Sequence, residues 1–390
     1  MASAFPASPD RSRLDRLLGY LDADPANPAL LTDALQEAIA AENLDAGDRI
    51  LSLAARANVT STGFQAHALH FCLLKTDYEA AAAYGDSALA QGLHHPAVVF
   101  NTGFARFYLQ RFADCAALML PYCAANPAHA AAAVIAARAL HHLDREEEAL
   151  PLLEQALAAE PELPEALGVK ALLLYELDRN AEALVCADMA LAGDADQLDA
   201  LLAKGEVLLE QDQPDYAAMI LQHLVDKHPT CGRGWSDLAQ CAFLAMDLPE
   251  VERCVRHGVE FMPEHIGSWH LLAWVHILKG ETGQAREVLQ RSYALDRNFA
   301  ETHGGLAVVD AMEGLTAEAE LGIRRALKLD AGCMSAQFAR LLLLKQGGDA
   351  VGAEALVKEV LEQPFGESGE TLFDLVVKQA RLMSEGKTRH

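Results

Sequence analysis

The sequence predicts an all-α protein whose helices stack as hairpins in a regular solenoid. Alanine supplies 72 of the 390 residues, while glycine (26) and proline (15) are scarce, a composition typical of long stretches of helix. Small residues recur in phase every 34 residues over most of the chain. Within each period, apolar residues recur at the three- and four-residue spacing of amphipathic helices. Such a period is typical of arrays in which each helical hairpin buries its apolar face against a neighbour.

The elements follow in a simple order. Residues 1–27 form an N-terminal segment, in which Arg11–Leu21 is predicted to be a short leading helix. Ten windows of 34 residues then cover residues 28–367 without an insertion, each expected to form a hairpin of two helices. The windows are residues 28–61, 62–95, 96–129, 130–163, 164–197, 198–231, 232–265, 266–299, 300–333 and 334–367.

Two positions of the window explain how each hairpin closes. Position 20 is small in all ten windows: Gly47, Ala81, Cys115, Ala149, Ala183, Ala217, Val251, Ala285, Ala319 and Ala353. Position 8 is Gly or Ala in seven of the ten. Small side chains there let two helix backbones approach closely, while larger apolar residues fill the space between neighbouring hairpins. Position 32 is proline in four windows, where it ends the second helix: Pro127, Pro161, Pro229 and Pro263.

Some windows depart from this pattern. Windows 28–61 and 62–95 lack the proline at position 32 and keep leucine at position 8, so we expect irregular hairpins there. Two prolines fall inside second helices, where we expect local bends, and two fall near helix starts, where proline is tolerated. They are Pro121 and Pro151, and Pro214 and Pro249, respectively.

The chain is expected to close the array with a capping helix. Residues 368–390 contain an amphipathic stretch, Glu370–Met383, whose polar outer face suits the end of a solenoid. Ser384–His390 is expected to form a tail without fixed structure.

Tryptophan at position 4 of two windows adds a family signature. With Trp235 and Trp269 at that position, and the small residues and prolines in phase, the chain resembles the tetratricopeptide repeat (TPR) family. The resemblance covers residues 28–367. It implies a right-handed superhelix of about ten TPR units, in which the first helix of each hairpin lines a concave groove.

Composition and charge exclude several functions. The chain has 31 Lys and Arg against 56 Asp and Glu, a net charge of −25. Nucleic acid is therefore not expected as a partner, because phosphate binding needs Lys and Arg. No signal peptide, lipid anchor or apolar run long enough to span a membrane is seen, so we expect a cytoplasmic protein without membrane insertion. The eight cysteines form no C-x-x-C pair, which favours small core residues in a reducing cytoplasm.

No catalytic chemistry is indicated. The sequence contains no phosphate-binding glycine loop, nucleophile elbow, zinc-protease or kinase motif. The histidine pairs, such as His94-His95 and His141-His142, are not completed by Cys or carboxylate ligands. We therefore predict a protein that is not an enzyme, with no catalytic residue, no metal site and no cofactor.

The groove implied by the TPR resemblance has an uneven lining. Window 96–129 supplies four aromatic residues, Phe100, Phe104, Phe107 and Tyr108, beside Asn101. They either pack between neighbouring first helices or form an exposed pocket that anchors an apolar side chain of a partner. The other predicted groove residues are Arg138, Tyr175, Glu176, Asp199, Glu206, Glu210, Arg233, Phe243 and Trp274. The carboxylates among them, with Glu165, predict a negative field in the central groove.

The family's two-carboxylate clamp for chaperone tails is not expected, because Asn101 and Arg138 are only isolated fragments of its pattern. The sequence favours a non-catalytic scaffold, adaptor or chaperone that binds a protein or peptide, part apolar and part basic, in the groove. The alternative is a substrate-selecting regulatory subunit of an enzyme or of a secretion or assembly complex, whose catalytic part is another chain.

Overall fold

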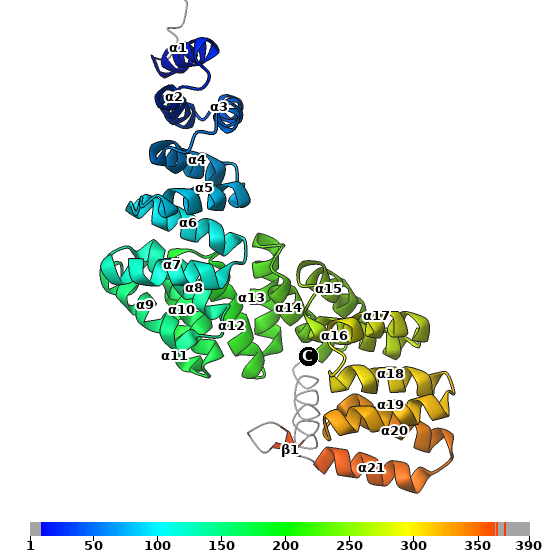
Figure 1. Cartoon of the computed structure of the whole chain (residues 1–390). Coiled ribbons are helices and arrows are strands. Elements are labelled where there is room, and N and C mark those ends of the chain that lie inside the picture. Colours follow the sequence, from blue (N-terminus) through cyan, green and yellow to red (C-terminus); the bar gives the residue numbers. More distant parts are fainter. Residues whose placement is uncertain (1–8, 363, 366–369, 372–390) are drawn as a thin grey trace, which may run out of the picture. The chain divides into compact units, whose positions relative to one another are not determined.

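The computed structural model describes residues 9–362, 364–365 and 370–371, and within them the chain forms 21 helices (Figure 1). The leading helix, α1 (Pro9–Ala23), is longer than the predicted Arg11–Leu21. Contacts divide the chain into two compact units, residues 1–207 and residues 208–390, and the division falls within α12.

The remaining helices form ten consecutive pairs whose starts advance by 34 residues. The first helices are α2 (Pro28–Ala40), α4 (Thr62–Leu74), α6 (Pro96–Tyr108), α8 (Ala130–His141), α10 (Pro164–Glu176), α12 (Leu198–Glu210), α14 (Gly232–Leu244), α16 (Ile266–Lys279), α18 (Ala300–Met312) and α20 (Met334–Gln346). The second helices are α3 (Leu44–Arg56), α5 (Tyr78–Ala90), α7 (Phe112–Ala125), α9 (Glu146–Ala159), α11 (Asn180–Gly193), α13 (Pro214–Lys227), α15 (Leu248–Phe261), α17 (Thr282–Leu295), α19 (Thr316–Leu329) and α21 (Ala350–Glu362). Each first helix therefore begins at the first residue of a predicted window.

The core of each hairpin lies where the small residues recur. Position 20 is buried in all ten hairpins, from Gly47 to Ala353, and position 8 is buried in nine, with Leu341 half-buried. At Gly47 the approach is so close that a Cβ would lie 2.1 Å from the ring of Phe71, which belongs to the next hairpin. Residue size at these positions therefore sets how closely the helices pack.

The turn inside every hairpin uses left-handed backbone. Position 15, just after the first helix, has a φ between 50° and 77° in all ten hairpins. Seven of these residues are not glycine: Glu42, Thr76, Gln110, Asp144, Asp178, Asp212 and Met246. The other three are Gly280, Gly314 and Gly348. A left-handed residue at this place ends the first helix and turns the chain into the second.

The first two hairpins are irregular at their second helices. Helices α3 and α5 have 13 residues, whereas α7 to α19 have 14 at every second-helix position. A second left-handed residue follows each of the two short helices, Asn58 with φ 50° and Gly92 with φ 85°. Both windows lack proline at position 32 and keep leucine at position 8, as window 334–367 also does, and its second helix α21 likewise has 13 residues.

In three hairpins of the second unit, an aromatic residue at position 4 ties the hairpin to the one before it. Trp235 Nε1 donates to the carbonyl of Pro229, and Trp269 Nε1 donates to that of Pro263, both at 2.7 Å. His303, at the same position of its window, contacts the carbonyl of Arg297 through Nε2 at 2.9 Å. In each case the carbonyl belongs to position 32 of the preceding window, so these motif residues serve the stacking of hairpins.

Four prolines lie at the helix positions predicted from the sequence. Pro121 and Pro151 are inside α7 and α9, and Pro214 and Pro249 are at the starts of α13 and α15. Within the described residues, none of the helices is long and apolar enough to cross a membrane.

The C-terminal end departs from a purely helical chain. Strand β1 (Pro364–Phe365) pairs antiparallel with β2 (Glu370–Thr371). The expected capping helix Glu370–Met383 therefore does not begin at Glu370, and its remainder, like the tail Ser384–His390, lies outside the described residues.

Candidate protein-binding surface

Five aromatic side chains gather on the first unit. Phe100, Phe104, Phe107 and Tyr108 share one face of α6, because their spacing returns to the same side of a helix. Tyr78, the first residue of α5, joins them. We call these five residues the aromatic strip.

The rings of the aromatic strip contact one another around Tyr108. Tyr78 stacks on Tyr108 with centroids 4.7 Å apart and planes 10° apart. Phe104 lies 4.7 Å from Tyr108, and Phe107 meets it edge-on at 5.6 Å. Mutual contacts of this kind hold aromatic side chains in fixed rotamers.

The strip is anchored on one side and open on the other. Phe100, Phe104 and Phe107 are half-buried and pack against a buried core cluster contributed by α7 to α12, while Tyr108 is 49% exposed. Asn101 is half-buried beside them. The three phenylalanines therefore support the packing of helices and the tyrosine faces solvent, while the binding of a partner there stays a prediction.

Histidines flank both ends of the strip. The ring of His129 lies 5.0 Å from that of Phe100, and its Nδ1 is 2.8 Å from the hydroxyl of Tyr122. His142 stacks on Phe112 at 4.1 Å, and burial, then the neighbouring His141 and Arg138, lower the pKa of His142. Tyr78 and Phe112 were not predicted from the sequence, although both occupy position 17 of their windows, which was the available signal.

A polar cluster lies on the same unit. Arg138 of α8 forms an ion pair with Asp199 of α12, two hairpins further on. Gln197 donates to the same carboxylate at 3.0 Å and accepts from the backbone N–H of Ala200 at 2.6 Å. Gly168 leaves room for it, since a Cβ there would lie 1.9 Å from Oε1 of Gln197. The arrangement fixes Arg138 and neutralises Asp199.

The predicted negative field is therefore carried by fewer carboxylates than the sequence indicates. Asp199 is only 7% exposed and Glu206 only 5% exposed, so neither presents its charge to solvent. Glu165 and Glu176 are exposed in the same unit, and Tyr175 is half-buried against its core.

The other predicted groove residues belong to the second unit. Glu210 is exposed, and Arg233, Phe243 and Trp274 are half-buried. Trp274 of α16 meets Phe338 of α20 edge-on at 5.4 Å. Whether any of these residues bind a partner stays a prediction.

The described residues contain no group of three or more His, Cys, Asp or Glu side chains placed to hold a metal ion. Six of the eight cysteines are buried: Cys72, Cys115, Cys123, Cys241, Cys254 and Cys333. Burial raises the pKa of Cys115 and of Cys254 to about 12, which keeps these thiols protonated and poorly nucleophilic. They act as small core residues.

Comparison with known proteins identifies the fold. No protein-family model and no curated protein matches the sequence. Among solved structures, a monomeric mutant of IFIT1 with the capped RNA m7Gppp-AAAA matches with a TM-score of 0.54 and 13% identity. The match covers 90% of this chain and 92% of that chain, and IFIT1 is a TPR protein. This chain has the TPR fold.

Shorter TPR proteins also match parts of this TPR chain. PilF of Pseudomonas aeruginosa matches with a TM-score of 0.48 and 15% identity, over 54% of this chain and 96% of its own. MamA of Desulfovibrio magneticus matches with a TM-score of 0.35 and 24% identity, over 41% of this chain and 91% of its own. At these identities the likenesses concern the fold and not the ligand.

Proposed function

We propose that this TPR chain is a non-catalytic scaffold or adaptor that binds a protein segment on its first unit, at the aromatic strip. The observation that carries the proposal is the exposed ring of Tyr108, held between Tyr78, Phe104 and Phe107. An aromatic side chain that is already fixed by its neighbours loses little conformational freedom on binding, so its contact area contributes efficiently to affinity. A chaperone would use the same strip to shield an apolar segment.

The partner segment is proposed to be part apolar and part basic. Apolar side chains would cover the strip, while the net charge of −25 and the exposed Glu165 and Glu176 favour Lys and Arg nearby. The faces of Tyr78 and Tyr108 would also attract a cation. We further propose a cytoplasmic location, which the buried cysteine thiols support.

Affinity capture from the native cell with three versions of the full chain tests the proposal. Proteins captured by the wild type should be lost with Tyr108→Ala, because that change removes the exposed ring. They should be retained with Tyr20→Ala, which removes a tyrosine of α1 that is 59% exposed. Capture of the same proteins by all three versions would place the binding site elsewhere.

A further inference from the structure

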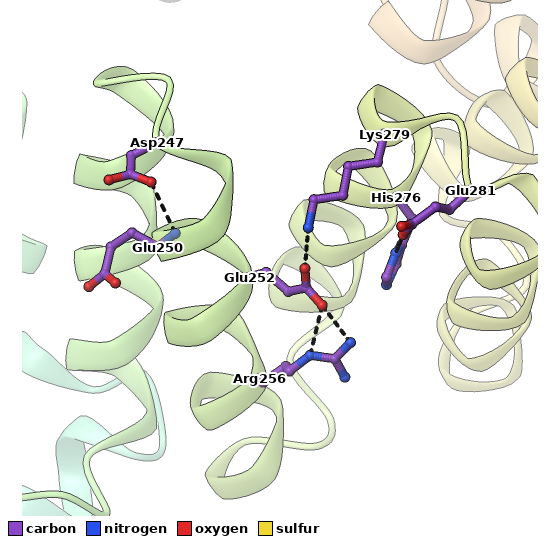
Figure 2. A network of polar contacts seen from close by, with 7 residues as sticks. All are labelled: Asp247, Glu250, Glu252, Arg256, His276, Lys279 and Glu281. Carbon is purple, nitrogen blue, oxygen red and sulfur yellow. Dashed lines mark hydrogen bonds and ion pairs between the residues drawn. The ribbon is translucent and has the colours of Figure 1, made fainter.

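The second helix of each hairpin packs beside the first helix of the next hairpin, and we call the line of contact between them an edge. Two side chains face each other across an edge: the residue at position 21 of the second helix and the residue at position 14, at the end of the next hairpin's first helix. At three edges an ion pair joins the two positions: Asp48 with Lys75, Glu252 with Lys279, and Arg286 with Glu313. Figure 2 shows Glu252 of α15 held between Lys279 of α16 and Arg256 of its own helix.

Other edges are closed by leucine. In the first unit, position 14 is Leu109 beside α5, Leu143 beside α7 and Leu177 beside α9, and all three are half-buried. At the α9–α10 edge, position 21 is also leucine, Leu150, which is buried. A large apolar side chain thus fills the place that an ion pair spans elsewhere.

The edge between α13 and α14 has neither an ion pair nor a leucine at these two positions. Position 21 is Ala218 and position 14 is Ala245, so two methyl groups stand where other edges have longer side chains. The α19–α20 edge differs, because Glu320 there is charged. Between α13 and α14 the result is a cleft of about 530 Å³, within the range of roughly 300–1,000 Å³ that ligand pockets occupy.

The floor of this α13–α14 cleft is apolar. Leu238 and Ala242 of α14 are buried and face the cleft between the two alanines. Met219 of α13 also lines it and is 70% exposed. A flexible, exposed methionine at an apolar opening can adapt to different side chains.

The rim of the cleft is acidic. Asp215 lies at the start of α13, and Asp247 and Glu250 lie at the start of α15. The Asp247 carboxylate accepts from the backbone N–H of Glu250 at 3.2 Å, and the Glu250 carboxylate accepts from Arg253, which lowers the pKa of Glu250. Three carboxylates and one guanidinium leave the rim negative.

We propose that the α13–α14 cleft is a second docking site, which takes an apolar side chain of a partner segment with Lys or Arg beside it. The apolar floor would bind the apolar side chain, and the acidic rim would attract the Lys or Arg by charge complementarity. The site lies on the second unit, so it adds to the aromatic strip of the first unit and does not depend on it.

A model peptide tests the site directly. The probe is a 14-residue helical peptide of leucine and lysine with leucines on one face, and its control replaces every lysine by glutamate. Ala218→Glu with Ala245→Lys should close the edge as Glu252 and Lys279 close theirs, and the net charge stays the same. Ala218→Leu should fill the cleft without adding a charge. It is the second closed variant, and it tests the site even if the ion pair of the first variant does not form.

The expected result is that the leucine–lysine peptide binds the wild type and binds both closed variants at least tenfold more weakly, measured by fluorescence anisotropy. The leucine–glutamate peptide should not bind. Circular dichroism should show that both variants keep the wild-type helix content. Tyr20→Ala, which removes an exposed tyrosine of α1 outside both proposed sites, should bind the peptide as the wild type does.

Equal binding to wild type and closed variants would overturn the proposal, because the peptide would then be held by net charge alone. Absence of binding to the wild type, or equal binding of the glutamate peptide, would overturn it as well. Loss of binding in Tyr108→Ala with full binding in the closed variants would assign the peptide to the aromatic strip instead.

Discussion

At the residue scale, the hairpin turns place unusual demands on position 15. Left-handed backbone costs a residue with a side chain roughly 1–2 kcal/mol relative to its preferred conformations, and glycine avoids this cost. Thr76 and Met246 nevertheless occupy such turns, with φ of 56° and 57°. The turn is imposed by the packing of the two helices, so no single residue type marks it. For that reason sequence reasoning did not recognise position 15.

Thr76→Gly should stabilise the first unit by about 0.5–1 kcal/mol, because relief of the left-handed strain exceeds the added entropy of the unfolded chain. The reverse change, Gly314→Thr, should destabilise the second unit by a similar or larger amount. Urea unfolding followed by circular dichroism measures both. A lower midpoint for Thr76→Gly would mean that the threonine side chain contributes more than its backbone strain costs.

A buried histidine is expected to make the second unit sensitive to acid. His270 is 8% exposed, and its Nε2 lies 2.9 Å from the hydroxyl of Thr302, which also contacts Ser292 at 2.8 Å. Burial lowers the pKa of His270 to about 4, from 6.5. The unfolded chain therefore binds a proton at a pH where the folded chain does not.

The sign of the pH dependence follows from this difference. Stability contributed by neutral His270 is present above pH 6.5 and is lost as the pH falls to 4, by an amount on the order of 3 kcal/mol. His270→Gln cannot be protonated and should lose correspondingly less stability between pH 7 and pH 4. The urea midpoints of the wild type and the variant are measured at both pH values. Equal losses of stability in the two proteins would show that His270 is not the acid-sensitive group.

At the element scale, the size of position 20 sets the distance between helices. Ala217 is fully buried in α13, whereas Met219 on the same helix is largely exposed. Ala217→Phe should cost about 1–3 kcal/mol or more by overpacking, while Met219→Phe should leave stability nearly unchanged. Thermal unfolding compares the two variants. If Ala217→Phe unfolds at the same temperature as the wild type, the hairpin has a different register from the one described.

The elements themselves could be predicted from the sequence because one physical requirement repeats. Ten small residues at position 20 mark ten helix crossings, and from these the helix starts at residues 28 to 334 follow. The short pairing of β1 with β2 could not be predicted, since two residues per strand carry no periodic pattern. Trp235 and Trp269 at position 4 could be recognised in the sequence, but their hydrogen bonds to the preceding hairpins could not.

At the scale of the whole molecule, net charge should govern association. The carboxylates of Glu165 and Glu176 are exposed and contribute to the negative surface, whereas Asp199 and Glu206 are buried. Once a partner is known, Glu165→Lys with Glu176→Lys should slow its association and weaken the dependence of that rate on salt. Phe104→Ala should instead speed dissociation, because it removes contact area. Stopped-flow kinetics measures the association and dissociation rates separately. Unaltered rates in both variants would exclude the aromatic strip and these two glutamates as the binding surface.

The candidate surface was predictable only in part. The four aromatics of α6 stand out because they fall within nine residues, but the burial of Asp199 depends on Arg138, 61 residues earlier in the sequence. Contacts across two hairpins depend on how tightly the first helices curve together, and this is set by small residues such as Gly168 between them. A list of groove positions cannot contain that information.

The direction of the ion pairs along the hairpin edges bears on how the array can evolve. Glu252 at position 21 meets Lys279, but at the next edge the charges are exchanged, with Arg286 at position 21 and Glu313 at position 14. Loss of one 34-residue repeat by recombination, residues 266–299, would set Glu252 against Glu313, two like charges at one edge. Repeats that look interchangeable in sequence are therefore matched to their neighbours, and this disfavours gain or loss of a unit at that place.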